Sequence, residues 1–167
     1  MKKERLNLFP GSFIVHPVSL ISVGMIIFND FYLKPSKTNP LIAGKLSDIS
    51  LMVFLPIFLA FIYIFLKYLV NSIVIIFKKE IKEDYSLPYY IIILSIFLSG
   101  LVMILLQVSD SFNVLFEKNI IFLKELLSNN RYSKITLTKD IYDLISIPFL
   151  LIPYLFLNRY RKENSNN

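Results

Sequence analysis

Charged and amide side chains gather at the ends of the long apolar stretches of this chain, where they can act on one another or on a ligand. Carboxylates accept hydrogen bonds and bind cations, while an ammonium group donates to carboxylates or phosphates. The candidate polar cluster consists of Asp30, Lys45, Asp48, Asp110, Asp140 and Asp143, with Asn29, Ser47 and Gln107 in support. These residue types suit charge-complementary binding of a cation or a polar lipid headgroup.

Three pairs within this set have the spacing of neighbours on a helix surface, because residues three positions apart share one helix face. The pairs are Lys45 with Asp48, Gln107 with Asp110, and Asp140 with Asp143. In any threading with four spans, the ends that carry these residues lie on the same face of the membrane. The spacing and the threading together favour one interacting cluster.

Helix dipoles give a second argument for pairing. Asp30 and Asp110 are expected near helix C-termini and Lys45 near an N-terminus, where each charge opposes the macrodipole. We therefore expect Lys45 to pair with a carboxylate, with Asp30 and Asp48 as first candidates. A structural alternative stays open, since Asp140 and Asp48 can simply complement or cap helix N-termini.

The elements that position these residues are four apolar stretches, each close to the ~20 residues needed to cross a bilayer. They predict an all-α polytopic membrane protein with four transmembrane helices in a single bundle. The expected spans cover residues 13–33, 46–70, 87–109 and 140–158. Ser95, Ser99 and Gly100 form a small polar seam in the third span, which is suited to close helix contact.

The longest connection contains apolar residues at helical spacing between charged ones, over residues 112–127. This pattern predicts an interfacial amphipathic helix. Ten basic residues on the side of the termini, against eight on the other side, place both termini in the cytoplasm under the positive-inside rule. We expect the protein to lie in a bacterial plasma (inner) membrane.

The amino-acid composition argues against several kinds of functional site. The chain has 167 residues with no Cys and one His, so a zinc site built from protein ligands alone is not expected. Its four glycines are too scattered for a phosphate-binding loop. An all-oxygen Mg²⁺ or Ca²⁺ site on the carboxylates is the only metal alternative, and no cofactor is required. The net charge of +6 reflects basic residues that flank the apolar stretches, which indicates lipid contact rather than nucleic-acid binding.

His16 lies outside the expected cluster. It is 14 residues from Asp30, or about 21 Å along a helix. His16 and Pro17 instead predict the start of the first helix, because a proline at the first helical position loses no hydrogen bond. Pro56 and Pro148 are expected to bend their helices or to mark local irregularity.

The order His16-Pro17, Asn29-Asp30 and then Gly44-Lys45-Leu46-Ser47-Asp48 resembles small bacterial multi-pass membrane proteins that carry a Gly-Lys-Leu-Ser-Asp segment entering their second span. The likeness covers roughly the first third of the chain. Ile49 departs from the small residue expected next. No established activity comes with this resemblance, which implies a membrane protein with a focus around Asp30, Lys45 and Asp48.

Three classes of function follow from these patterns. A binding or transport module would engage a cation, a proton or a polar headgroup, whereas a membrane enzyme would act on a lipid-linked substrate. A structural or regulatory subunit of a membrane complex would use the charges only to fix helix packing. The missing nucleophile, base and metal-ligand patterns favour the non-catalytic interpretations. The bilayer is the expected partner, and a protein partner is compatible with the chain.

Overall fold

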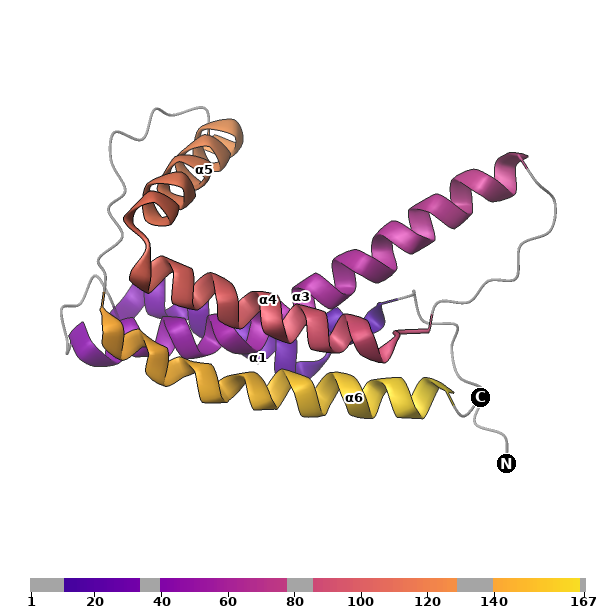
Figure 1. Cartoon of the computed structure of the whole chain (residues 1–167), viewed down its shortest axis with the longest axis horizontal. Coiled ribbons are helices and arrows are strands. Elements are labelled where there is room, and N and C mark those ends of the chain that lie inside the picture. The colour runs from indigo at the N-terminus through magenta and orange to yellow at the C-terminus, as the bar shows by residue number, and fades with distance from the viewer. Residues whose placement is uncertain (1–10, 34–39, 78–85, 129–139, 166–167) are drawn as a thin grey trace.

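The computed structural model describes residues 11–33, 40–77, 86–128 and 140–165, and all of its regular structure is helical (Figure 1). The all-α prediction is confirmed. The elements are η1 (Ser12–Val15), α1 (Pro17–Phe28), η2 (Asn29–Leu33), α3 (Pro40–Phe77), α4 (Tyr89–Val108), α5 (Asp110–Ser128), η3 (Ile141–Leu150) and α6 (Leu151–Ser165).

Four helical rods form a bundle in which successive rods run in opposite directions (Figure 1). They are α1 with η2, the first half of α3, α4, and η3 continued by α6. Phe13 and Tyr160, one near each terminus, stack edge to face with ring centroids 5.0 Å apart. The described parts of the two chain ends therefore lie at one end of the bundle, here called the terminal end.

The start of α1 follows the sequence prediction. His16 is the N-cap and its Nδ1 accepts a hydrogen bond from the Val18 amide, while Pro17 occupies the first helical position. Just before it, Gly11 has φ +90°. A Cβ atom at Gly11 would lie 2.9 Å from the Phe61 ring, so glycine is required here both for backbone angle and for space.

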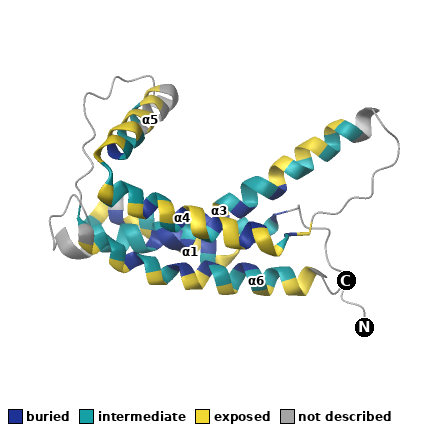
Figure 2. Cartoon of the chain, viewed as in Figure 1, coloured by how far each residue is buried: buried dark blue, intermediate teal, exposed yellow. Residues whose placement is uncertain are grey.

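The interior contains two apolar clusters, one toward each end of the bundle. The larger one lies toward the terminal end and includes Phe13, Ile57, Ile64, Ile92 and Leu157. The smaller one joins Met52, Met103 and Leu150. Figure 2 shows the buried residues where the four rods meet.

Helices α4 and η3 approach closely along the predicted small-residue seam. Ser95 and Ser99 are buried, and each hydroxyl donates to a carbonyl of its own helix. A Cβ atom at Gly100 would lie 3.3 Å from Leu150 Cδ1. Small residues thus let these two rods approach, as predicted.

The fourth rod begins as a 3₁₀-helix of ten residues and becomes α-helical at Leu151. Pro148 and Pro153 lie within it and lack the N–H that an α-helix would use. The irregularity predicted at Pro148 is confirmed. A 3₁₀-helix rises about 2.0 Å per residue, so this rod is longer than an α-helix of the same sequence.

Among the described residues, two helices have the length and the apolar composition to cross a membrane, over Gly44–Val74 of α3 and Tyr89–Val108 of α4. The helical run Pro17–Leu33 is apolar but shorter. Helix α3 is one continuous helix whose second half leaves the bundle, and α5 projects from the opposite end (Figure 1). The amphipathic helix predicted over 112–127 is present as α5; its contact with a membrane surface stays a prediction.

Candidate functional site

Lys45 lies between two carboxylates at the end of the bundle opposite the termini. Its ammonium nitrogen donates to Asp140 Oδ2 at 3.0 Å and also to Asp143 Oδ1. The expected pairing of Lys45 with a carboxylate is confirmed, through partners almost a hundred residues away in sequence. The sequence alone had favoured Asp30 and Asp48 as first candidates.

Gln107 of α4 completes the network with both ends of its amide group. Its Nε2 donates to Asp143 Oδ2 at 2.9 Å, and its Oε1 accepts from the Asp140 backbone N–H at 2.9 Å. Lys45, Gln107, Asp140 and Asp143 thus form a four-residue cluster that joins α3, α4 and the start of η3. We call it the Lys45 cluster.

Local geometry presents both carboxylates of the fourth rod to Lys45. Asp140 is the N-cap of η3 and its Oδ1 accepts from the Tyr142 amide at 3.0 Å. The Asp143 amide donates to the Asp140 carbonyl at 2.8 Å, which closes the first turn. Asp140 therefore serves both as the structural cap that the sequence left open and as an ion-pair partner.

The Lys45 cluster is partly shielded and carries an excess of negative charge. The side chains of Lys45, Asp140 and Asp143 are 24%, 39% and 14% exposed. One ammonium and two carboxylates sum to one negative charge at neutral pH. Coulomb interactions are stronger here than in open water because little solvent surrounds Asp143.

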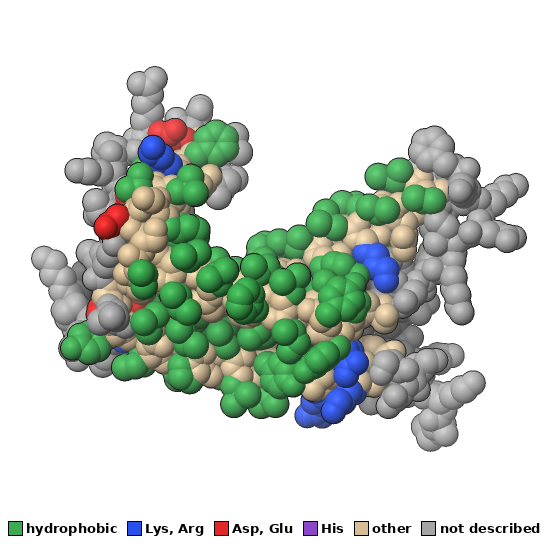
Figure 3. All heavy atoms as spheres, in the orientation of Figure 1, with side chains coloured by type: hydrophobic (Ala, Val, Ile, Leu, Met, Phe, Trp, Pro, Cys, Tyr) green, Lys and Arg blue, Asp and Glu red, His purple; other side chains and the backbone are tan. Residues whose placement is uncertain are grey.

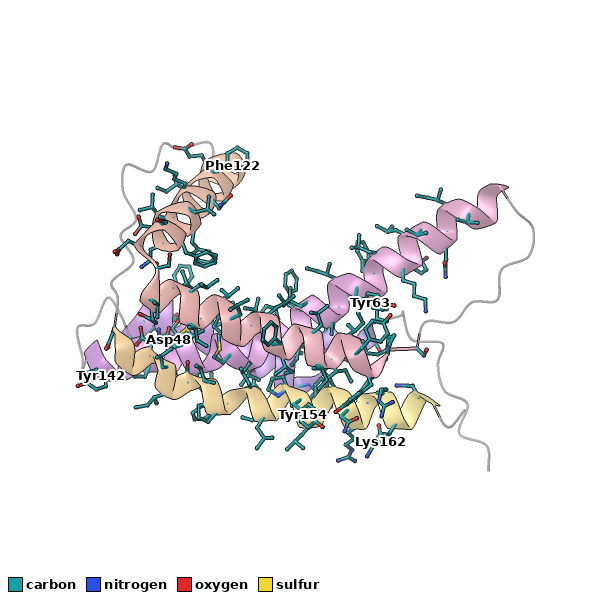
Figure 4. All side chains as sticks on the ribbon, viewed as in Figure 1. Asp48, Tyr63, Phe122, Tyr142, Tyr154 and Lys162 are labelled. Carbon is teal, nitrogen blue, oxygen red and sulfur yellow. The ribbon has the colours of Figure 1, made fainter. Side chains whose placement is uncertain are left out.

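The remaining predicted residues lie nearby in sequence but differ in their surroundings. Asp48 is half-buried one turn after Lys45, and Figure 4 shows it at the same end of the bundle as Tyr142. Ser47 is half-buried beside it on α3. Asp30 belongs to η2, and its side chain lies outside the described part of the structure.

The expected placement of Asp110 is wrong. Helix α4 ends at Val108, and Asp110 is exposed in the first turn of α5. A carboxylate complements the positive end of a helix dipole at that position. Its charge therefore needs no partner in the Lys45 cluster to explain it.

Asn29 is the most deeply buried of the supporting residues, at 0% exposure. Neither its Oδ1 nor its Nδ2 has a hydrogen-bond partner among the described residues, and the same holds for the Ser50 hydroxyl. Unpaired buried amides are costly. These two residues are therefore polar positions that local packing does not account for.

A second polar site, which the sequence analysis did not single out, lies at the terminal end. A cavity of about 550 Å³ is lined by both apolar and ionic side chains of α6 and by the start of α1. Arg159 Nε donates to Glu163 Oε1 at 2.9 Å within it. The four-residue spacing of this pair was the available signal.

No protein-family model, curated protein or solved structure matches this chain. Within the described residues, no group of three or more His, Cys, Asp or Glu side chains is arranged to hold a metal ion. In the Lys45 cluster, the ammonium itself lies between the two carboxylates.

Proposed function

We propose that the protein is a four-span integral membrane protein that acts as a structural or regulatory subunit, not as an enzyme. The observation behind this proposal is the Lys45 cluster, in which one ammonium, two carboxylates and one amide bind each other. Because their main polar groups are paired with one another, the cluster fixes the relative positions of three helices. Ion pairs of this kind have their best-attested use in setting register and orientation.

The distribution of polarity supports residence in lipid. Small polar residues are buried between the helices, including Ser19, Ser22 and Ser146. Large apolar residues face outward, including Leu20 on α1 and Phe97 on α4 at 55% and 63% exposure. Figure 3 shows hydrophobic side chains over most of the visible face of the bundle. Small polar residues at helix contacts with apolar exteriors are typical of membrane bundles.

Two polar levels on the bundle are separated by about the thickness of a hydrocarbon core. Near the terminal end, tyrosine hydroxyls pair at 3.3 Å, Tyr63 with Tyr90 and Tyr89 with Tyr154. Tyrosines are enriched at membrane interfaces. Tyr90 and Gln107 are 17 residues apart on α4, or about 26 Å, against about 30 Å for the core. The Lys45 cluster then lies at the second interface.

The fourth rod is long enough to cross because of its 3₁₀ segment. Ile141–Leu150 contributes about 20 Å and residues 151–157 about 10 Å more, which together approach 30 Å. Residues 17–33 on the first rod give about 25 Å. The first rod packs on α3, and the fourth rod packs on both α3 and α4, which supports a bundle that crosses as one unit.

Basic residues support the orientation that we propose, with the terminal end in the cytoplasm. Lys67, Arg159, Arg161 and Lys162 lie toward the terminal end, and the positive-inside rule assigns that end to the cytoplasm. Figure 4 shows Lys162 at this end and Asp48 at the other. A bacterial plasma membrane is the compatible location.

Cysteine labelling tests whether the fourth rod crosses, because the described chain has no native cysteine. Asn119→Cys on α5 and Asn164→Cys on α6 form a matched pair, since both are exposed and both side chains bond the carbonyl four residues earlier. Four spans place the two thiols on opposite sides of the membrane. If only α3 and α4 crossed, both thiols would react from the same side, which would overturn the four-span proposal.

A second function, binding of a cation or polar headgroup at the Lys45 cluster, is favoured by its net negative charge and by the 39% exposure of Asp140. Neutral substitution at Lys45 and Asp143 separates the two functions when membrane abundance and cellular phenotype are scored independently. Loss of phenotype at normal abundance favours binding. Loss of abundance alone favours the packing role.

A further inference from the structure

The cavity at the terminal end has an amphipathic lining that runs along α6. Its apolar wall is formed by Val18, Ile152, Leu155 and Phe156, and its polar wall by His16, Arg159, Tyr160 and Glu163. The lining on α6 runs from Ile152 to Glu163, a distance of about 16 Å along the helix. That length matches a lipid headgroup together with the upper part of an acyl chain. We call this feature the α6 groove.

Its polar wall contains donors that suit a phosphate. Arg159 is held by Glu163 through Nε, which leaves its two terminal NH₂ groups as donors in the paired geometry that phosphate oxygens accept. His16 Nδ1 accepts from the Val18 amide. In the neutral imidazole the proton is then on Nε2, which can donate.

The N-terminus of α1 adds no further donors at this site. The Ser19 and Leu20 amides both donate to the His16 carbonyl, and Pro17 has none. Recognition of an anionic group in the α6 groove therefore depends on side chains, and above all on Arg159.

The charges of the groove match a headgroup that carries both signs. Arg159 and Glu163 contribute one positive and one negative charge, so the wall is neutral overall. A carboxylate has about four acceptor positions, so Glu163 can accept from Arg159 and from an ammonium at the same time. A phosphate joined to a primary amine complements this pair, whereas a headgroup with only negative charge does not.

We propose that the α6 groove binds one glycerophospholipid with a primary-amine headgroup, of the phosphatidylethanolamine type. The phosphate lies against Arg159 and His16, the ammonium against Glu163, and an acyl chain along Val18 and Leu155. This inference rests on the proposed function, because it requires α6 to cross the bilayer with Arg159 at headgroup level. It adds a specific lipid to the general contact with the membrane.

The absence of tryptophan from the chain allows a clean fluorescence test. Leu155→Trp places a single reporter in the groove. Leu151→Trp is its matched control, since Leu151 is one turn earlier, is 59% exposed against 57% for Leu155, and does not line the groove. Each full-length variant is reconstituted in phosphatidylcholine vesicles containing a minor fraction of phosphatidylethanolamine. In one set of samples the phosphatidylcholine has brominated acyl chains, and in a second set the phosphatidylethanolamine has them. The bromine atoms quench tryptophan fluorescence.

We expect brominated phosphatidylethanolamine to quench the Leu155→Trp reporter about fivefold more than its mole fraction predicts. The Leu151→Trp control should be quenched only in proportion to that fraction. Arg159→Gln or Glu163→Gln in the Leu155→Trp chain should remove the excess. Lys162→Gln, an exposed basic position that does not line the groove, should retain it. If Lys162→Gln removes the excess quenching to the same extent as Arg159→Gln, general surface charge explains the effect and the proposal is overturned.

Phosphatidylglycerol as the minor lipid gives the specificity arm. If phosphatidylglycerol gives as much excess quenching as phosphatidylethanolamine, the groove recognises only the phosphate. That result overturns the assignment of the ammonium to Glu163. If bulk lipid quenches both reporters but phosphatidylethanolamine gives no excess quenching, α6 still crosses the membrane and only the groove proposal fails. If neither reporter is quenched by any brominated lipid, α6 does not cross and the proposed function fails.

Native mass spectrometry of the unsubstituted protein provides a second measurement that needs no reporter. In micelles with equal amounts of the three lipids, one retained phosphatidylethanolamine per chain is expected. Retention without preference among the three overturns the proposal.

Discussion

Gln107 and Asp143, 36 residues apart in the chain, are joined by a hydrogen bond of 2.9 Å between α4 and η3. The same amide also accepts from the Asp140 backbone, so Gln107 holds a carboxylate and a main-chain group at once. A neutral side chain thereby orients both charges that meet Lys45. This double contact makes Gln107 the most direct point at which to test the Lys45 cluster.

Gln107→Leu should lower the free energy of unfolding by about 1–3 kcal/mol, because it leaves a shielded carboxylate oxygen and a backbone N–H without their partner. Thermal unfolding in lipid–detergent micelles measures the change. Asn119→Leu is the control, since that exposed amide donates to the Leu115 carbonyl of its own helix. Equal effects of the two variants would contradict a special role for Gln107.

Lys45→Met should destabilise the bundle by roughly 1–3 kcal/mol, since it leaves Asp140 and Asp143 facing each other without a counter-charge. Adding Asp143→Asn to the same chain should recover part of that loss. A double-mutant cycle on unfolding free energies gives the coupling directly. Strict additivity of the two changes would mean that the contact contributes nothing to stability.

The sequence predicted the members of the Lys45 cluster better than their pairing. Three-residue spacing and the shared face expected from a four-span threading were enough to group Lys45, Gln107, Asp140 and Asp143. Which carboxylate meets Lys45 depends on the azimuth of each rod, and a 3₁₀ start to the fourth rod changes that azimuth relative to an α-helix. Nothing local in the sequence specifies this rotation.

Helix ends were the other source of error. The sequence pattern assigns Asp110 to the C-terminus of the third apolar helix, but the chain turns at Ser109 and Asp110 begins α5. The sequence pattern places the break between residues 109 and 112, but it does not specify to which of the two helices Asp110 belongs. The groove at Arg159 escaped prediction for a different reason, because its lining combines residues from opposite ends of the chain and the residues from each end are ordinary alone.

Gly11→Ala should destabilise the terminal end by about 1–3 kcal/mol. Its φ of +90° disfavours any residue with a Cβ atom, and that atom would lie 2.9 Å from Phe61 Cδ2. Gly24→Ala is the matched control, since a Cβ atom there meets nothing within 4 Å in a regular helix. It should raise stability by up to about 1 kcal/mol. Thermal unfolding of the two variants should therefore shift in opposite directions, and a shared direction would rule out this explanation.

Asn29→Leu should raise the free energy of unfolding by about 1 kcal/mol if the bundle is purely structural. The amide is fully buried and neither of its polar atoms has a hydrogen-bond partner among the described residues, so an apolar residue of similar size removes a desolvation cost. Ser50→Ala, at a second buried and unpaired polar position, should act in the same direction with a smaller effect. Thermal unfolding and cellular phenotype are scored separately for each variant.

Higher stability with intact phenotype supports the subunit role, in which Asn29 serves no ligand. Higher stability with a lost phenotype would instead indicate that the protein retains a costly amide because it binds a ligand, and would favour a binding site at Asn29. A fall in stability would contradict both the unpaired state of Asn29 and the packing argument built on it.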